Sequence, residues 1–218
     1  MEDIDAIAAL QDPVRRRLYE YVAAQGREVG RNEAAEAAGV ARTLAAHHLD
    51  KLTDAGLLES GSRRLTGRSG PGAGRPAKVY TRSRAERAVS LPARDYRTAA
   101  ELLAEAAEEA GLDAGLCAAA RRRGEALRGS AAPCGDLEEA MEMLAARGYE
   151  PHLEGAEVRM RNCPFHAVAE RFPPLVCGMN LALLEGLLGT DGPVRARMDA
   201  RPGECCVAVN QDSESNPD

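Results

Sequence analysis

The residues of this chain best suited to chemistry are cysteines near its C-terminus. The stretch NCPFHAVAERFPPLVCGMN holds Cys163, His166 and Cys177, and the stretch RPGECCVAV further on adds Cys205 and Cys206. Thiolate sulfur and imidazole nitrogen bind zinc, and thiolates hold iron–sulfur clusters. The alternative is a set of buried free thiols, since an unpaired cysteine packs as a small hydrophobic residue.

The sequence around these cysteines favours ligands over core thiols. Cys163 comes directly after a predicted strand, and Cys177 lies in or just after the first turn of an apolar helix predicted over 174–189, behind two prolines. Unpaired N–H groups and the positive end of a helix lower the pKa of a thiol there. The sequence RPGE before Cys205 has proline and glycine at the central positions of a type II turn. Turns and helix starts are ligand positions rather than mid-strand core positions.

The adjacent pair Cys205 and Cys206 is expected to divide between two faces. Neighbouring residues of a regular strand point to opposite sides, so we expect Cys205 rather than Cys206 to join Cys163 and Cys177, unless the strand is irregular there. The fourth ligand is left open between His166 and Cys206. His166 has a second interpretation, as the cap of a short helical turn.

The spacing of the cysteines leaves the metal open. The pattern C-x13-C-x27-C lacks the close C-x2-C pair of many structural zinc sites. Widely separated cysteines fit a [4Fe-4S] cluster held between loops, and Zn²⁺ is the alternative. A third hypothesis is an enzyme with Cys163 as nucleophile and His166 as base. Because a three-residue spacing on a turn is poor geometry for that pair, we expect that the protein is not an enzyme.

Composition limits the class of protein. The chain has 218 residues, of which 44% are hydrophobic and 28% charged, as in ordinary globular proteins. No apolar run reaches the roughly 20 residues that a membrane span needs. The acidic start MEDIDAIAAL lacks the basic region of a signal peptide, so we expect a cytoplasmic location and no membrane partner. In the cytosol, six cysteines are expected to be free thiols or ligands rather than disulfides.

Charge is unevenly spread over the chain. The net charge is −6, yet residues 1–85 hold 14 Lys and Arg against 11 Asp and Glu, a net of +3. Within residues 41–85 the count is 9 against 3, a net of +6. A basic stretch on an otherwise acidic protein indicates one element that binds a polyanion.

The N-terminal third has the pattern of a helix-turn-helix. Helices are predicted over 12–26, from Gly30 to Gly39 and from Arg42 to Ala55, each ended by glycine. In the last helix Ala45, Leu49, Leu52 and part of His48 form the inner face, and the outer face is Arg42, Thr43, Ala46, His47 and Asp50. A small α-hairpin of another kind is the alternative on this pattern alone.

The following residues favour a DNA-binding wing. Strands predicted over 57–64 and 77–81 flank a Gly/Pro loop. Its GRP sequence, residues 74–76, resembles the core of an AT-hook, which places arginine in a narrow minor groove. The residues expected to contact bases in the major groove are Arg42, Thr43 and His47. Those expected to contact phosphates are Lys51, Arg63 and Arg64, and the wing loop adds Arg68 and Arg75.

The rest of the chain is predicted to be mixed helix and sheet. Helices are expected over 98–111 and 112–129 and from Asp136 to Gly148, and strands over 149–153, 156–161, 193–199 and 204–210. Capping boxes are predicted for Thr98 with Glu101 and for Asp136 with Glu139. The apolar face predicted for the first of these helices is Leu102, Leu103, Ala106 and Ala110. The face predicted for the third is Leu137, Ala140, Met141, Leu144 and Ala145. Cys117 is expected in a core, and Cys134 in a loop without a role.

The predicted fold class is α+β. The expected parts are a winged helix-turn-helix domain over 1–85, a helical linker or dimerisation region over 86–132, a cysteine-containing α+β sensor domain over 133–210 and a disordered tail over 211–218.

The motifs resemble known regulators. LAAHHLDKLTDAGLL, residues 44–58, and GRPAKVY, residues 74–80, resemble the recognition helix and wing of ArsR-type winged-helix repressors. CPFH, LVCGMN and the late cysteine after a turn resemble the SufR branch of that group. The resemblance implies a homodimeric transcriptional repressor that binds a palindromic double-stranded DNA operator. It also implies sensing of redox, iron or nitric oxide state through a [4Fe-4S] cluster.

The resemblance assigns Cys163, Cys177 and Cys205 as cluster ligands, with a fourth ligand that is not a fixed cysteine. The first cysteine spacing here is one residue longer than in that family, so the target genes do not follow from the resemblance.

Overall fold

The chain divides into two units, residues 1–94 and 95–218. The structure is a computed structural model and describes residues 2–63 and 76–212. The division lies later than the boundary expected at residue 85, and the helices of the expected region 86–132 belong to the second unit. Each unit has its own hydrophobic core. In the part of the chain that the structure describes, no helix has the length and apolar character to cross a membrane.

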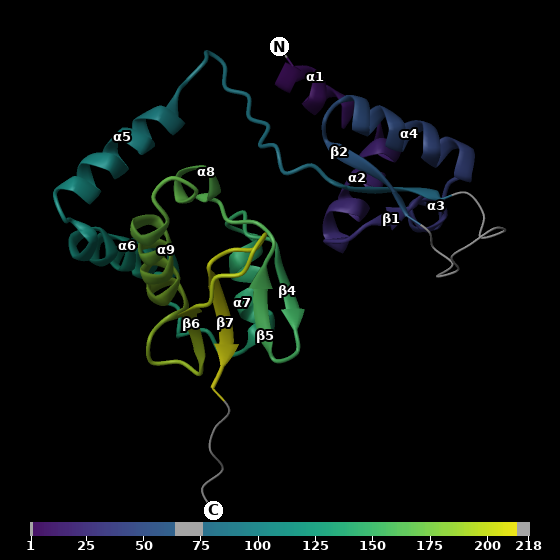
Figure 1. Ribbon diagram of the computed structural model, residues 1–218. Coiled ribbons are helices and arrows are strands. Elements are labelled where there is room, and N and C mark those ends of the chain that lie inside the picture. The colour runs from purple at the N-terminus through teal and green to yellow at the C-terminus, as the bar shows by residue number, and fades with distance from the viewer. Residues whose placement is uncertain (1, 64–75, 213–218) are drawn as a thin grey trace, which may run out of the picture. The chain divides into compact units, whose positions relative to one another are not determined.

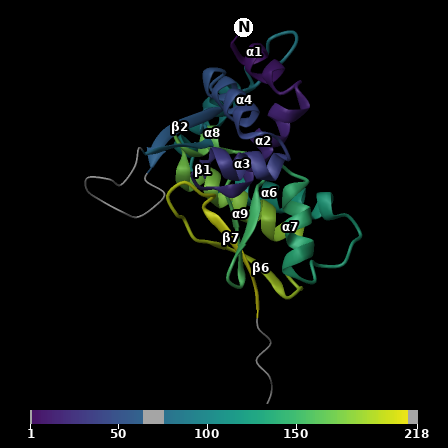
Figure 2. The same ribbon diagram turned by 90° about the vertical axis from the view of Figure 1, so that its right-hand side faces the viewer.

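The first unit packs four helices with a small sheet (Figures 1 and 2). In chain order its elements are α1 (Glu2–Ala9), α2 (Pro13–Gln25), β1 (Val29–Gly30), α3 (Arg31–Ala38), α4 (Arg42–Asp54), β2 (Leu58–Arg63) and β3 (Ala77–Arg82). The carboxylate of Asp12 accepts hydrogen bonds from the Val14 and Arg15 amides and begins α2, and Gly26 ends it in the left-handed region. The predictions for α2, α3 and α4 are therefore confirmed. The elements α1 and β1 were not predicted.

The predicted wing strands form an antiparallel hairpin. β3 lies between β1 and β2 in the sheet, and the β2–β3 register runs from Leu58 opposite Arg82 to Arg63 opposite Ala77. The core beneath the sheet is built from small and aliphatic side chains of the three main helices and one tyrosine, among them Leu18, Val22, Ala34, Ala35, Ala45, Leu49, Leu52 and Tyr80. The inner face predicted for α4 is therefore correct.

The second unit packs helices against one face of a four-stranded antiparallel sheet (Figure 1). Its elements are α5 (Tyr96–Glu109), α6 (Asp113–Arg128), α7 (Leu137–Ala145), β4 (Pro151–Glu154), β5 (Glu157–Met160), α8 (His166–Ala169), α9 (Pro173–Leu188), β6 (Val194–Met198) and β7 (Val207–Gln211). The strand order is β4-β5-β7-β6. Val158 and Met160 of β5 meet Leu144 of α7 and Leu184 of α9 in one core. The mixed helix and sheet content agrees with the predicted α+β class.

The capping box predicted at Thr98 is wrong. Helix α5 begins earlier, because the carboxylate of Asp95 accepts a hydrogen bond from the Thr98 amide at 2.9 Å. Aspartate is at least as good an N-cap as threonine. Glu101, the other half of the predicted box, instead pairs with Arg97 and Arg171. The box at Asp136 begins α7 as predicted, since its carboxylate accepts from the Glu139 amide at 2.8 Å.

The apolar face predicted for α5 is not buried within the chain. Leu102 and Leu103 are 61% and 72% exposed. The packed side of this helix is instead formed by Ala104 and Ala107, which contact the Phe172 cluster at the start of α9. Large side chains therefore point to solvent where the sequence pattern predicted packing.

Two smaller expectations also change. Ala145, predicted on the apolar stripe of α7, is exposed at the end of that helix. Strand β7 runs to Gln211, so the sheet continues into the segment 211–218 that was expected to be tail. Residues 213–218 lie outside the described part of the chain.

Helices α6 and α9 cross with their backbones in close contact. A Cβ atom added to Gly186 would lie 2.2 Å from the carbonyl oxygen of Arg121, and one added to Gly124 would lie 2.2 Å from that of Leu183. Such distances are far inside van der Waals contact, so both positions require glycine for the observed packing. Two glycines, one on each helix, thus set how closely α6 approaches α9.

We expect Gly186→Ala to lower the free energy of unfolding of the second unit by about 1–3 kcal/mol, as overpacked cores do. The matched control is Gly115→Ala, in the exposed part of α6, where an added Cβ meets no atom within 4 Å. That substitution should raise the stability by about 0.5–1 kcal/mol, because glycine is unfavourable in a helix. Urea denaturation followed by circular dichroism measures both, and equal stability of the two variants would contradict the close crossing.

Candidate functional site

Four thiols from three segments of the second unit come together. Cys163 lies in the loop between β5 and α8, Cys177 lies in α9, and Cys205 and Cys206 lie just before β7. The Cys205 thiol is hydrogen-bonded to those of Cys163 and Cys206, and the Cys206 thiol is hydrogen-bonded to that of Cys177. We call these four residues the thiol cluster. The three cysteines predicted as ligands are in it, together with Cys206.

The expectation that at most one of the adjacent pair would join held only for a regular strand, and the segment is irregular here. Cys205 and Cys206 precede the first residue of β7, Val207, and Cys206 lies in a bend. The alternation of side chains holds for a regular strand and not for a bend. The turn RPGE forms as predicted, with Gly203 at φ 82°, but the strand begins three residues later than the expected start at residue 204.

His166 does not belong to the thiol cluster. It begins the short helix α8, its side chain is 63% exposed, and its Nε2 atom lies 3.2 Å from a carboxylate oxygen of Glu170. Its backbone N–H donates to the Cys163 carbonyl at 3.0 Å. Of the two candidates for the fourth position, the structure brings Cys206 to the other thiols.

The two remaining cysteines lie elsewhere. Cys117 is half-buried in α6 beside Gly178. Cys134, expected in a loop without a role, is 1% exposed and packs in the main core of the unit. Its thiol donates to the Asp136 carbonyl at 3.2 Å, and burial raises its pKa to about 11. Both act as packing residues in this structure.

The first negative charge in the thiol cluster is favoured at Cys205. Hydrogen bonds from the thiols of Cys163 and Cys206, from the Val207 amide and from the side chain of Asn180 lower the pKa of Cys205 well below its usual range. The pKa values of Cys163 and Cys206 are raised, first because each donates a hydrogen bond to Cys205 and then because each is buried. A thiolate that accepts several hydrogen bonds is a ligand prepared for a metal.

Asn180 and Tyr149 belong to this site, and the sequence analysis missed both. Asn180 lies on α9, is 0% exposed, and its Nδ2 atom is 3.4 Å from the sulfur of Cys205. The Tyr149 hydroxyl donates to the Asn180 Oδ1 atom. The sequence feature that could have identified Asn180 was a single amide side chain in a helix that is otherwise apolar nearly all round.

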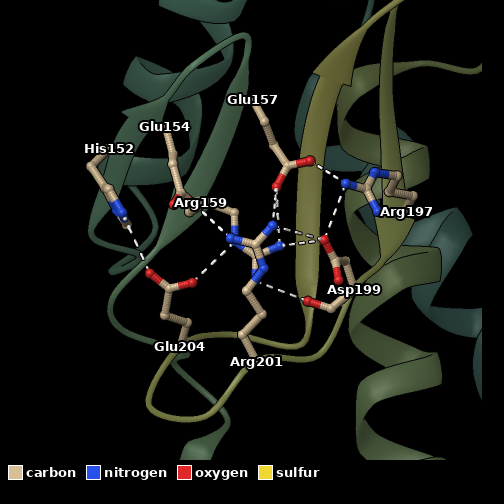
Figure 3. A network of polar contacts seen from close by, with 8 residues as sticks. All are labelled: His152, Glu154, Glu157, Arg159, Arg197, Asp199, Arg201 and Glu204. Atoms are coloured by element: carbon tan, nitrogen blue, oxygen red, sulfur yellow. Dashed lines mark hydrogen bonds and ion pairs between the residues drawn. The ribbon is translucent and has the colours of Figure 1, made fainter.

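The loop that carries Cys205 and Cys206 is held by a buried arginine (Figure 3). Arg159 of β5 is 0% exposed. It alternates with Val158 and Met160, whose side chains face the core, so it faces the opposite side of the sheet. Its Nη1 atom lies 3.0 Å from an Asp199 carboxylate oxygen, and its Nη2 atom donates to the Asp199 carbonyl at 3.0 Å.

Arg159 also reaches the other end of the same loop. Its Nε atom lies 3.1 Å from a Glu204 carboxylate oxygen, and Glu157 lies 3.2 Å from Nη1. Since Asp199 begins the loop and Glu204 directly precedes Cys205, one guanidinium ties both ends. Outer members of the same network, visible in Figure 3, are His152, Glu154, Arg197 and Arg201. The Cys205 amide further donates to the Met160 carbonyl at 2.9 Å.

The donor set fits a thiolate-bound metal group. Four soft sulfur ligands suit zinc or an iron–sulfur cluster rather than magnesium or calcium. N–H groups of Phe165, Val207 and Asn180 donate to sulfurs of the thiol cluster, and ligands of bound metals commonly accept hydrogen bonds of this kind. Within residues 2–63 and 76–212, however, no group of three or more His, Cys, Asp or Glu side chains is arranged to hold a single metal ion.

A second candidate site is the exposed face of α4. Arg42, Thr43, His47 and Lys51 are all exposed on this helix. Asp50, also expected on the outer face, is instead held by the wing: its carboxylate accepts from the Tyr80 hydroxyl at 2.7 Å and from Lys78 at 2.8 Å. This contact fixes the helix against β3 and leaves the four basic and polar residues as its free surface.

The wing is described only in part. Arg63, at the end of β2, is exposed and lies 3.1 Å from Glu28. Arg64, Arg68 and Arg75, which were also predicted to contact DNA, lie outside the described residues.

Replacing Arg159 by leucine should leave Asp199, Glu204 and Glu157 without their shared partner. We expect a loss of about 3 kcal/mol in the free energy of unfolding, as for other broken buried ion pairs. Arg195→Leu is the control, since its partner Asp212 is 57% exposed and exposed pairs contribute only about 0–1 kcal/mol. Thermal denaturation measures stability, and the rate of alkylation of the thiols measures release of the loop. An unchanged rate would show that Arg159 does not hold it.

Comparison with known proteins bears on the first unit. A family model described as a helix-turn-helix domain matches residues 10–61, which run from the end of α1 into β2. Neither a curated protein nor a solved structure matches the chain. The matched residues contain the buried contacts among α2, α3 and α4 described above. The chain thus carries a helix-turn-helix domain, which supports a DNA-binding transcriptional regulator.

Proposed function

We propose that this protein is a transcriptional repressor that senses redox, iron or nitric oxide state through a [4Fe-4S] cluster. Its ligands are Cys163, Cys177 and Cys205, with Cys206 as the fourth. The observation that carries the proposal is the meeting of four thiols from three separate segments, next to N–H groups that donate to their sulfurs. The resemblance of CPFH and LVCGMN to the SufR branch of ArsR-like repressors supports the same assignment.

When bound, an iron–sulfur cluster supplies a redox centre whose potential depends on its ligands and hydrogen bonds. The residues of the chain do the rest. Cys205 is prepared as a thiolate by its hydrogen bonds. Arg159 fixes the loop that carries it. The four ligands come from a loop, a helix and a hairpin, so occupation of the site would add a direct link among three segments that also share one hydrophobic core.

On the DNA side, α4 is the recognition helix of the proposal. In helix-turn-helix proteins the second helix enters the major groove, and two-fold operators are read by dimers. Arg42, Thr43 and His47 contact bases and Lys51 contacts phosphate. The exposed Leu102 and Leu103 of α5 form the surface for a second copy of the chain, since a palindromic operator needs two copies and these side chains have no partner within the described residues.

Zinc is the second candidate, because cysteine sulfurs are also the ligands of structural zinc sites. A zinc site would make the second unit a structural or metal-sensing domain of the same regulator.

Protein purified without oxygen should be coloured and should contain about four iron and four sulfide per chain, as a [4Fe-4S] cluster requires. Cys177→Ser and Cys206→Ser should lose most of the visible absorption while the N-terminal unit stays folded. Cys117→Ser is the matched control and should keep it. Metal and sulfide analysis with an absorption spectrum measures this. A colourless protein with one zinc per chain would select the second candidate, and a full cluster in Cys177→Ser would refute the ligand assignment.

DNA contacts can be tested on an operator selected by the protein itself from random sequences. Arg42→Ala should weaken binding by about tenfold or more, as the loss of a base contact costs about 1–3 kcal/mol. Lys51→Ala should lower the slope of log affinity against log salt by about one. Arg122→Ala, an exposed arginine of α6, is the control. Fluorescence anisotropy measures affinity, and light scattering tests for two chains per site. Equal losses in all three variants would remove α4 as the recognition helix.

A further inference from the structure

Asn180 is a buried amide in an otherwise apolar helix. It is 0% exposed on α9, with Leu184 one turn further on also fully buried. Burying an amide without hydrogen-bond partners is unfavourable in free energy, so the hydrogen bonds of the Asn180 side chain indicate its role. Its side chain is hydrogen-bonded to Tyr149 and to Cys205.

Tyr149 fixes which way the amide points. The tyrosine, 4% exposed, donates its hydroxyl hydrogen to the Asn180 Oδ1 atom. Only an oxygen can accept that hydrogen, so the amide nitrogen must lie on the other side. There it is 3.4 Å from the sulfur of Cys205. An amide nitrogen has hydrogens to give and none to accept, so Asn180 faces the thiol cluster as a donor.

We propose that Asn180 is a positioning residue that donates a hydrogen bond to the Cys205 sulfur and thereby raises the reduction potential of the group held by the thiol cluster. Tyr149 acts through Asn180, by holding its amide in the donating orientation. The proposal rests on the proposed function, because it concerns the group that the same thiols bind.

The sign follows from electrostatics. Reduction adds negative charge to the cluster and its sulfur ligands, and a hydrogen-bond donor stabilises negative charge. The reduced state is therefore stabilised more than the oxidised state, and the potential rises. The backbone amides of Phe165 and Val207 donate to the thiol cluster as well. Asn180 is the side-chain donor, so substitution can remove it.

Three variants separate donation from packing. Asn180→Leu keeps a side chain of similar size and removes the donor, Tyr149→Phe frees the amide to turn, and the double variant removes both. Leu184→Ala is the control, because it removes buried apolar volume on the same helix and no hydrogen-bond donor. Potentiometric titration of the loaded protein gives the midpoint potential, and thermal denaturation gives the stability.

We expect Asn180→Leu to shift the redox equilibrium toward the oxidised form by about tenfold, which for a one-electron couple is a fall of about 59 mV in the midpoint potential. Tyr149→Phe should show a smaller fall, and the double variant should match Asn180→Leu. Leu184→Ala should lower the melting temperature at an unchanged potential.

Each other outcome identifies what failed. If wild-type protein holds no cluster, the proposed function fails and this inference fails with it. If wild-type protein holds a cluster and Asn180→Leu lowers only the melting temperature, Asn180 is a packing residue and this inference alone is overturned. If the effects of Tyr149→Phe and Asn180→Leu add in the double variant, Tyr149 does not act through Asn180, and that part is refuted.

Discussion

The thiol cluster depends on a single buried charge. Arg159 is fully buried, and removing a guanidinium from water is unfavourable unless its N–H groups find hydrogen-bond acceptors in the protein. Two carboxylates and a carbonyl from the loop 199–204, with Glu157 beside them, supply these partners. Because Asp199 and Glu204 stand at the two ends of that loop, the bonds that make the burial of Arg159 tolerable also fix the position of Cys205.

Local signals allowed much of the fold to be predicted. Helix ends depend on neighbours in sequence, so Asp12, Gly26 and Asp136 mark boundaries that the structure confirms. The prediction failed where two local signals compete. Thr98 has the spacing of a capping box, yet Asp95 is the cap, and the helix therefore begins earlier. The apolar face of α5 was expected either to pack or to form a dimer surface, since an apolar pattern does not say whether its partner lies within the same chain.

The site could be predicted only in part, for a related physical reason. Turns and prolines marked three cysteines, and these signals are local. Cys206 was left as one of two candidates for the fourth position, because side-chain alternation holds for a regular strand and the sequence did not show that this segment is a bend. Arg159 and Asn180 were missed altogether. A polar residue inside an apolar run gives no indication of its partners when they lie 25 to 45 positions away in the chain, and only the folded structure brings them together.

Helix α9 is the element through which occupation of the thiol cluster can affect the rest of the second unit. It carries Cys177 and Asn180 near one end, and at the other Gly186 meets the backbone of α6. Close-packed contacts of this kind have no free space in which a displacement could be absorbed. A movement of α9 would therefore carry α6 with it, and α6 follows α5, whose Leu102 and Leu103 are exposed. The glycine pair thus gives the proposed sensor a physical connection between its thiols and its exposed apolar face.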